Sequence, residues 1–245
     1  MALKIFIDEM TREEFKKMLE TVKVAVIPTG STEQHGPHLP MKVDIANTLH
    51  IVRKAAETLY PQIIVTPPVT IGVSPHHLCY PGSLSLRHET FINLLVDICR
   101  SLKHHGINKI AIVNGHGGNA APGYLAARRA RDELGLKMVF ISYWSLIPRE
   151  ISDSILETKI IPGHACEFET SLALAIYPEL VSKEIPHAVE APWRLQGFVY
   201  DTDEITGDGY VGDPSLATAE KGEKLIDAAV KGLVSLLKDF ITKVE

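Results

Sequence analysis

The chain has 245 residues, of which 45% are hydrophobic and 22% are charged, and its formal net charge is −5. This composition is ordinary for a globular protein with enough residues to bury a full core. The negative charge argues against nucleic acid or an anionic membrane surface as a partner. Three cysteines at wide spacings exclude a disulfide framework and a four-thiolate zinc site. The 11 histidines are unusually many, and histidine is a common metal ligand.

The N-terminus lacks the charged start and apolar run that are typical of a signal peptide. No stretch of the sequence approaches the roughly 18 apolar residues that a membrane span needs. We therefore expect a cytoplasmic protein.

Apolar runs of strand length alternate along the chain with segments of helical period. In chain order, the sequence predicts a strand at 22–28, a helix at 45–60, a strand at 63–67, a helix at 91–105, a strand at 109–114, a helix at 120–134, a strand at 138–142 and helices at 169–177 and 217–244. This alternation predicts a three-layer α/β fold, with a mostly parallel sheet and helices on both faces. Residues 1–245 show no repeat or linker, so we expect one domain.

The first polar cluster follows the strand predicted at 22–28. Glu33 and His35 are two residues apart, so an extended loop directs both side chains to one face. Asp44 follows at the start of the next helix. Two carboxylates and an imidazole form a ligand set that suits zinc, manganese or iron. The alternative is a solvated polar loop in which Asp44 only serves the helix N-terminus.

The second cluster is the glycine-rich turn Asn114-Gly115-His116-Gly117-Gly118-Asn119, which follows the strand predicted at 109–114. Its spacing is neither the dinucleotide-binding fingerprint nor a P-loop, which disfavours a nucleotide site. A histidine at the end of a strand suits a metal, and the backbone amides of Gly117 and Gly118 could bind a substrate anion or oxyanion.

The third cluster opens the helix predicted at 169–177. His164 and Glu167 are three residues apart and would share a face if this turn is helical. Glu169 has a plainer explanation as a first-turn carboxylate that favours the helix dipole. Outside these clusters, Ser74 and His77 lie in a proline-stiffened loop where either could contact a substrate. Trp144 and Trp193 could line the same pocket, although buried aromatic residues more often belong to a core or an interface.

Taken together, the motifs resemble the creatininase (creatinine amidohydrolase) family. The resemblance extends from about residue 24 to residue 224. It is carried by Glu33-Gln34-His35-Gly36 with Asp44, the turn at 114–119, and the segments 80–86, 164–171 and 212–218.

The resemblance implies a doubly wound α/β fold, a site for two divalent metal ions and hydrolysis of a non-peptide C–N bond in a small-molecule substrate. By motif position, the metal ligands would be Glu33, His35, Asp44 and His116, with Asp44 bridging the two ions. His164 would be the acid/base that gives a proton to the leaving nitrogen. The family also implies a homo-oligomer, either a hexamer or a dimer.

The sequence departs from creatininase itself, which carries a metal-binding carboxylate at the position of Gly118. The second metal ion then lacks a ligand, and our hypothesis is that Glu167 supplies it. Gly117 and Gly163 also replace a bulky aromatic residue and a carboxylate of creatininase, so creatinine is not the expected substrate.

Three alternatives to the hydrolysis of a cyclic amide remain open at this point. A formamidopyrimidine-type deformylase of flavin or deazaflavin biosynthesis would need a lysine or arginine near Gly117 to hold a phosphate. A peptide-processing relative would need an open groove. A non-catalytic metal- or nucleotide-binding module would lack a metal position that water can reach.

Overall fold

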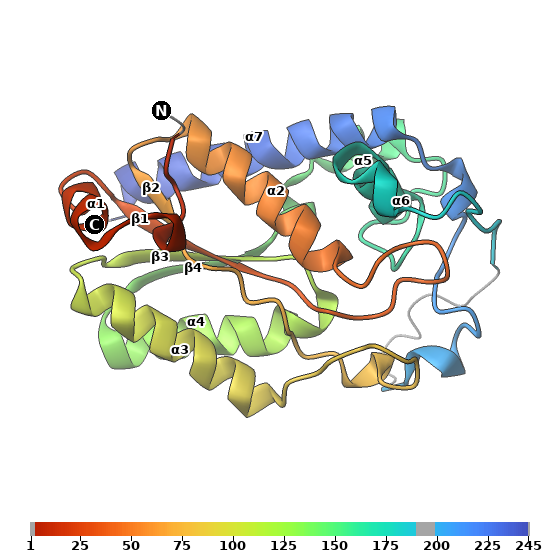
Figure 1. Cartoon of the computed structure of the whole chain (residues 1–245), viewed down its shortest axis with the longest axis horizontal. Coiled ribbons are helices and arrows are strands. Elements are labelled where there is room, and N and C mark those ends of the chain that lie inside the picture. The colour runs from red at the N-terminus through yellow and green to blue at the C-terminus, as the bar shows by residue number, and fades with distance from the viewer. Residues whose placement is uncertain (1–2, 190–198, 245) are drawn as a thin grey trace.

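Four parallel strands form the central sheet of the computed structural model, which describes residues 3–189 and 199–244 (Figure 1). The strands are β1 (Val24–Thr29), β2 (Ile63–Val65), β3 (Lys109–Asn114) and β4 (Lys137–Ser142), in the spatial order β2-β1-β3-β4. β1 is buried along its whole length, as expected for a parallel strand that is covered on both faces.

The strand side chains alternate between two hydrophobic clusters, one on each face of the sheet. In β1, Val24 and Val26 belong to the first cluster, whereas Ala25 and Ile27 belong to the second. β3 shows the same alternation. Because successive side chains of a strand point to opposite faces, a run of apolar residues fills both cores at once.

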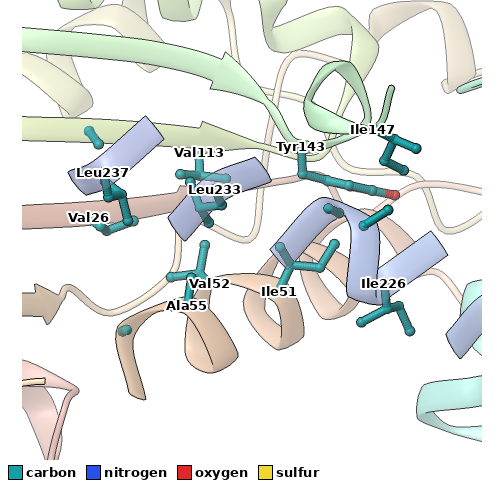
Figure 2. Close-up of a cluster of buried hydrophobic side chains, with 14 of the residues drawn as sticks. Val26, Ile51, Val52, Ala55, Val113, Tyr143, Ile147, Ile226, Leu233 and Leu237 are labelled. Carbon is teal, nitrogen blue, oxygen red and sulfur yellow. The ribbon is translucent and has the colours of Figure 1, made fainter. Parts of the chain in front are cut away.

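The first face is covered by α2 (Val43–Thr58) and α7 (Ala219–Lys243), and α6 (Glu167–Ile176) packs against both of these helices (Figure 1). Figure 2 shows Val52 of α2 and Leu233 of α7 close to Val113 of the sheet. α7 has 25 residues and runs the length of this layer.

The opposite face is covered by α3 (His88–His104) and α4 (Ala120–Leu134). Two short helices, α1 (Arg12–Met18) and α5 (Arg149–Ile155), were not predicted from the sequence. α1 has only seven residues, and its clearest sequence signal is the capping box that Thr11 forms with Glu14.

The predicted α/β class, with a parallel sheet and helices on both faces, is confirmed. All four predicted strands and all five predicted helices are present, with ends that differ by a few residues. None of the helices in the described ranges is long and apolar enough to cross a membrane.

The sheet places the functional loops beside each other. Thr29, the last residue of β1, pairs with Asn114, the last residue of β3. The backbone nitrogen of Gly115 also donates to the Thr29 carbonyl oxygen over 2.8 Å. The loops that follow these two strands therefore start side by side, at the carboxyl edge where α/β proteins commonly bind ligands.

Truncation of a core residue should test this packing. Leu233 is fully buried between α7 and the sheet. We expect Leu233→Ala to lower the free energy of unfolding by about 2–5 kcal/mol, because it removes buried methyl groups and leaves a cavity. Urea denaturation measures the change. Leu180→Ala is the control, since Leu180 is 45% exposed and its truncation should cost less than about 0.5 kcal/mol.

Candidate metal centre and cavity

The loop after β1 and the first turn of α2 bring two carboxylates and an imidazole together. Glu33, His35 and Asp44 are each at most 3% exposed. His35 Nε2 lies 3.1 Å from Asp44 Oδ1. Gly30 allows the loop to approach α2 closely, because a Cβ at this position would lie 2.6 Å from the Ile45 backbone nitrogen.

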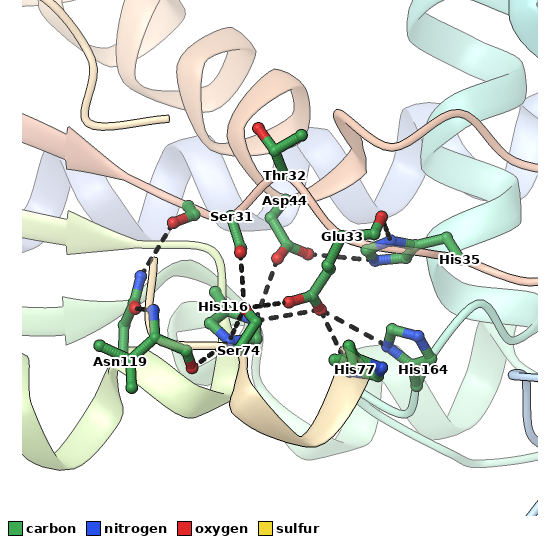
Figure 3. A network of polar contacts seen from close by, with 12 residues as sticks. Ser31, Thr32, Glu33, His35, Asp44, Ser74, His77, His116, Asn119 and His164 are labelled. Atoms are coloured by element: carbon green, nitrogen blue, oxygen red, sulfur yellow. Dashed lines mark hydrogen bonds and ion pairs between the residues drawn. The ribbon is translucent and has the colours of Figure 1, made fainter. Parts of the chain in front are cut away.

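His116 joins this group from the loop after β3. Its Nδ1 lies 3.1 Å from Glu33 Oε1 and 3.1 Å from Asp44 Oδ2 (Figure 3). The two oxygens of Asp44 therefore face two different imidazoles, His35 and His116. Atoms that bind one ion at about 2.1 Å lie roughly 3–3.4 Å from each other, so both contacts of His116 Nδ1 have the spacing of ligands of one ion. Glu33, His35 and Asp44 also offer ligand atoms within 4.8 Å of one another.

A backbone carbonyl holds the second ring nitrogen of each of these histidines. His35 Nδ1 donates to the Glu33 carbonyl oxygen over 3.1 Å, and His116 Nε2 donates to the Val73 carbonyl oxygen over 3.0 Å. Since a carbonyl oxygen only accepts, these nitrogens carry the ring proton. In the neutral rings, which are the form that binds metal, the lone pairs of His35 Nε2 and His116 Nδ1 face the carboxylates, an arrangement typical of metal-binding histidines.

Two buried atoms support the fit of this donor set to a metal ion. Within residues 3–189 and 199–244, His35 Nε2 and Asp44 Oδ2 are among the buried side-chain atoms without a hydrogen-bond partner. An unsatisfied buried polar atom costs about 1–3 kcal/mol. Divalent cations bound on the two sides of Asp44 would satisfy both atoms, because His35 Nε2 lies beside Oδ1 and Oδ2 lies on the His116 side.

Glu169 supplies a third carboxylate from the first turn of α6. Its Oε2 lies 3.9 Å from His35 Nε2 and accepts a hydrogen bond of 2.5 Å from the Ala165 backbone nitrogen. His35, His164 and Glu169 offer ligand atoms within 4.8 Å of one another. Glu169 thus lies beside the imidazole that faces the Oδ1 oxygen of Asp44.

Glu167 does not reach this cluster, which corrects our hypothesis that it is a metal ligand. Its carboxylate accepts hydrogen bonds from Lys221 Nζ (2.6 Å) and the Thr158 backbone nitrogen (2.9 Å). Two causes explain the error. Ala165 has a φ of 47°, so the turn from His164 is not helical and the three-residue spacing does not place the two side chains together. Residues two apart on α6 also point to different sides.

A cavity of about 160 Å³ lies over the cluster. Its lining includes His77 and His164, whose ring centroids are 4.4 Å apart. His77 Nε2 lies 3.4 Å and His164 Nδ1 lies 3.9 Å from Glu33 Oε1. Trp144 also lines the cavity, whereas Trp193 lies outside the described residues.

Of the four residues predicted to contact substrate, Ser74 and Gly118 do not line the cavity. Ser74 is fully buried, and its Oγ donates to Glu33 Oε2 over 2.5 Å. It therefore helps to orient the Glu33 carboxylate and does not face the cavity. Gly118 packs against the Val73 carbonyl oxygen, which would lie 2.1 Å from a Cβ at this position. Gly117 does line the cavity, and its binding of a substrate anion or oxyanion stays a prediction.

The charges of the cluster perturb one another strongly. Burial raises the pKa of Glu169 to about 8, and the neighbouring Asp44 carboxylate contributes to this rise. Burial also opposes the ionisation of Glu33, but the imidazole of His116 holds the pKa of Glu33 well below its usual range. Burial lowers the pKa of His77 to about 3, so this ring is neutral. A cluster of this kind would release protons when a cation binds, because its carboxylates and imidazoles bind metal in their deprotonated forms.

Sequence reasoning missed three contributors to the site. Glu169 was assigned to the helix dipole, and Gln34 was passed over although it lies between Glu33 and His35. Gln34 Nε2 is 3.0 Å from His77 Nδ1 and also 3.0 Å from His164 Nε2. The third contributor is the segment after residue 199, which closes one side of the cavity with Tyr200, Thr202, Ile205, Thr206 and Val211.

A parallel α/β sheet that carries buried carboxylates and imidazoles at its carboxyl edge defines the class of this protein. It is an α/β protein whose buried donor cluster could hold a divalent metal beneath a small cavity.

Comparison with known proteins identifies the family. The family model described as creatinine amidohydrolase (Creatininase) matches residues 8–237. The creatinine amidohydrolase of Pseudomonas putida is 27% identical, over 98% of this chain and 98% of its own length. The mycofactocin precursor peptide peptidase of Mycolicibacterium smegmatis is 31% identical, over 91% of this chain and 87% of its own length. The chain therefore belongs to the creatininase family, and it is a hydrolytic enzyme.

Solved structures agree with this assignment. A creatininase mutant complexed with creatine has a TM-score of 0.90 and 27% identity, covering 98% of this chain and 100% of that chain. Two further creatininase structures, described as a manganese form and a Zn-Zn form, each have a TM-score of 0.86 at 27% identity. The family predicted from the sequence is thus confirmed.

The two glutamates of α6 allow a matched test of the metal ligands. We expect Glu169→Gln to weaken the binding of one metal ion by at least about tenfold, since even the loss of an outer partner costs 10- to 100-fold. Glu167→Gln should leave metal binding unchanged, because its carboxylate bonds to Lys221 instead. Metal content after dialysis, measured by plasma emission spectrometry, distinguishes the two variants. Equal loss in both would contradict the assignment.

Glu167 should instead control stability in a pH-dependent way. Burial opposes its ionisation, but hydrogen bonds from Lys221 and Thr158 hold the pKa of Glu167 below its usual range. Its stabilisation is therefore present above the unfolded pKa of about 4.3 and is lost as the pH falls through the lower folded pKa. We expect Glu167→Gln to destabilise the fold by about 1–3 kcal/mol at pH 7. Urea denaturation should show this deficit shrinking as the pH approaches 3.

Proposed function

We propose that this protein is a divalent-metal-dependent hydrolase that cleaves the C–N bond of a small amide, cyclic amide or formamide. The observation that carries the proposal is the position of Asp44, whose oxygens face His116 on one side and His35 on the other. We assign Asp44 as the bridge between two ions. One ion would be held by Glu33, Asp44 and His116, and the other by His35, Asp44 and Glu169.

The donor set suits zinc, manganese or iron, because it combines imidazole with carboxylate and contains no thiolate. A bound ion of this kind supplies activated water at neutral pH and polarises a carbonyl group. We therefore propose that activity requires a bound divalent metal ion, and metal analysis of the purified protein identifies that ion.

His164 is assigned the transfer of a proton to the leaving nitrogen. Hydrolysis forms a bond between the oxygen of water and the carbonyl carbon and breaks the C–N bond. The leaving nitrogen then takes up one of the two protons of water. His164 lines the cavity with Nδ1 directed toward Glu33 Oε1, 3.9 Å away, so it is within reach of groups bound over the cluster.

The size and lining of the cavity favour a small substrate without a phosphate. Its volume of about 160 Å³ suits a small ring better than an extended peptide. The described residues that line it include no lysine or arginine. The small volume disfavours the peptide-processing alternative, and the missing cationic side chain disfavours the formamidopyrimidine alternative, which would carry a phosphate. Relatives of this chain include a creatinine amidohydrolase, a mycofactocin precursor peptide peptidase and a 3-dehydro-scyllo-inosose hydrolase, so the substrate varies among them.

The decisive experiment combines metal analysis with a substrate screen. The purified chain, loaded in turn with zinc, manganese and iron, is tested on cyclic amides, linear amides and formamides, and ring opening or release of amine or formate is measured. Turnover that disappears with a chelator and returns with metal is expected. Tightly bound metal without turnover of any class would contradict the proposal and favour a non-catalytic metal-binding module. Light scattering of the same samples tests the predicted homo-oligomer.

Replacement of His164 tests its assigned role. We expect His164→Ala to lower kcat by about 10²–10⁴-fold while metal content is retained, because the loss affects proton transfer and leaves the metal ligands in place. The control is His104→Ala, since His104 is exposed at the end of α3. A parallel loss of metal and activity would instead identify His164 as a metal ligand.

A further inference from the structure

Two histidines stand next to each other on the cavity wall, and one glutamine contacts both. The ring centroids of His77 and His164 are 4.4 Å apart. Gln34 Nε2 lies 3.0 Å from His77 Nδ1 and 3.0 Å from His164 Nε2. The hydrogen bonds of Gln34 therefore bear on which ring nitrogen of each histidine carries a proton.

The orientation of the Gln34 amide is fixed by a backbone donor. The backbone nitrogen of Gly36 donates to Gln34 Oε1 over 2.9 Å, and a backbone N–H can only donate. The oxygen of the amide must therefore face Gly36, and the NH₂ group must face the histidines. Gly209, with a φ of 71°, leaves room for this amide, since a Cβ there would lie 2.3 Å from Gln34 Oε1.

This orientation fixes the tautomer of His77. Gln34 Nε2 can only donate, so His77 Nδ1 accepts and carries no proton. The Thr202 hydroxyl lies 3.0 Å from the same Nδ1 and can donate to it as well. The single proton of the ring is then on Nε2, on the cavity side. Its approach of 3.4 Å to Glu33 Oε1 is longer than the usual limit of about 3.2 Å for a good N–H···O bond, so the N–H is available to a ligand.

His164 has a different environment at the corresponding nitrogen. Its Nε2 lies 3.0 Å from the Gln34 carbonyl oxygen, an acceptor, and 3.0 Å from Gln34 Nε2, a donor. A proton on Nε2 can be given to the carbonyl oxygen, and a bare Nε2 can accept from the amide. Both tautomers of His164 are therefore satisfied, whereas His77 is held in one.

We propose that His77 is a catalytic hydrogen-bond donor, whose Nε2–H binds the carbonyl oxygen of the substrate amide as negative charge develops on it, while Gln34 is the residue that positions it. His164 remains the group that changes its protonation. This division of roles rests on the proposed hydrolysis of an amide. A preorganised donor to a developing oxyanion contributes about 10²–10³-fold to kcat.

The first test requires no substrate. Two-bond ¹⁵N–¹H correlation spectra of the zinc-loaded, full-length protein, labelled with ¹⁵N-histidine, report which ring nitrogen is protonated. Comparison with the spectrum of His77→Gln assigns the His77 signals. We expect a protonated Nε2 and a bare Nδ1. A protonated Nδ1 would overturn the proposal, whether or not a substrate has been found.

The second test uses the amide that the screen identifies. We expect His77→Ala to lower kcat by about 10²–10³-fold with metal content unchanged. His77→Gln should recover activity to within roughly tenfold of the wild type, because the glutamine amide places an N–H donor near the position of histidine Nε2. His88→Ala, an exposed residue at the start of α3, serves as the control.

The two tests separate the possible failures. Loss of metal in both His77 variants would overturn the proposal and identify His77 as a metal ligand. Such a role is geometrically possible, because Glu33, His77 and His164 offer ligand atoms within 4.8 Å of one another. Equal impairment by alanine and glutamine would show that donation by the side chain is not what matters. If the wild type hydrolyses no amide, the proposed function fails, and the tautomer measurement still decides whether His77 is the fixed donor.

Discussion

The site depends on the burial of one carboxylate, that of Asp44, which is 3% exposed. A buried carboxylate is stable only if both of its oxygens are compensated. Each oxygen of Asp44 faces an imidazole, and either the protonated form of that ring or a cation bound between the two groups supplies the compensation. The helix dipole adds to this, because Asp44 lies in the first turn of α2. The imidazoles come from the loops after β1 and β3, so these two loops must converge on this one side chain, and Glu169 of α6 lies beside one of the two rings.

The glycine-rich turn ties these loops to each other through its last residue. Asn119 accepts a hydrogen bond of 2.9 Å from the Val73 backbone nitrogen, and its amide donates to the Gly30 carbonyl oxygen over 3.0 Å. One side chain thereby joins the loop after β1, the segment that carries Ser74 and His77, and the turn that carries His116. The imidazole rings of His35 and His116 are likewise positioned by hydrogen bonds to backbone carbonyl oxygens.

Local patterns predicted the sheet and the helices that cover it, because buried strands and amphipathic helices each have a characteristic spacing of hydrophobic residues in the sequence. They also brought Glu33, His35, Asp44 and His116 to one edge, since these residues follow strand ends or open a helix. Which of the two glutamates, Glu167 or Glu169, joins the donor cluster could not be predicted in this way. It depends on the left-handed conformation of Ala165, two residues before α6 begins. It also depends on Lys221 of α7, more than 50 positions away, whose ion pair with Glu167 keeps that carboxylate away from the cluster.

The packing around Gly118 also has an evolutionary consequence. A Cβ at this position would lie 2.1 Å from the Val73 carbonyl oxygen and 2.5 Å from His116 Nε2. A lineage with this loop therefore cannot gain a carboxylate there by a single codon change without displacing the hydrogen bond that orients His116. Any side chain at this position therefore requires the loop at Val73 and the glycine-rich turn to change together.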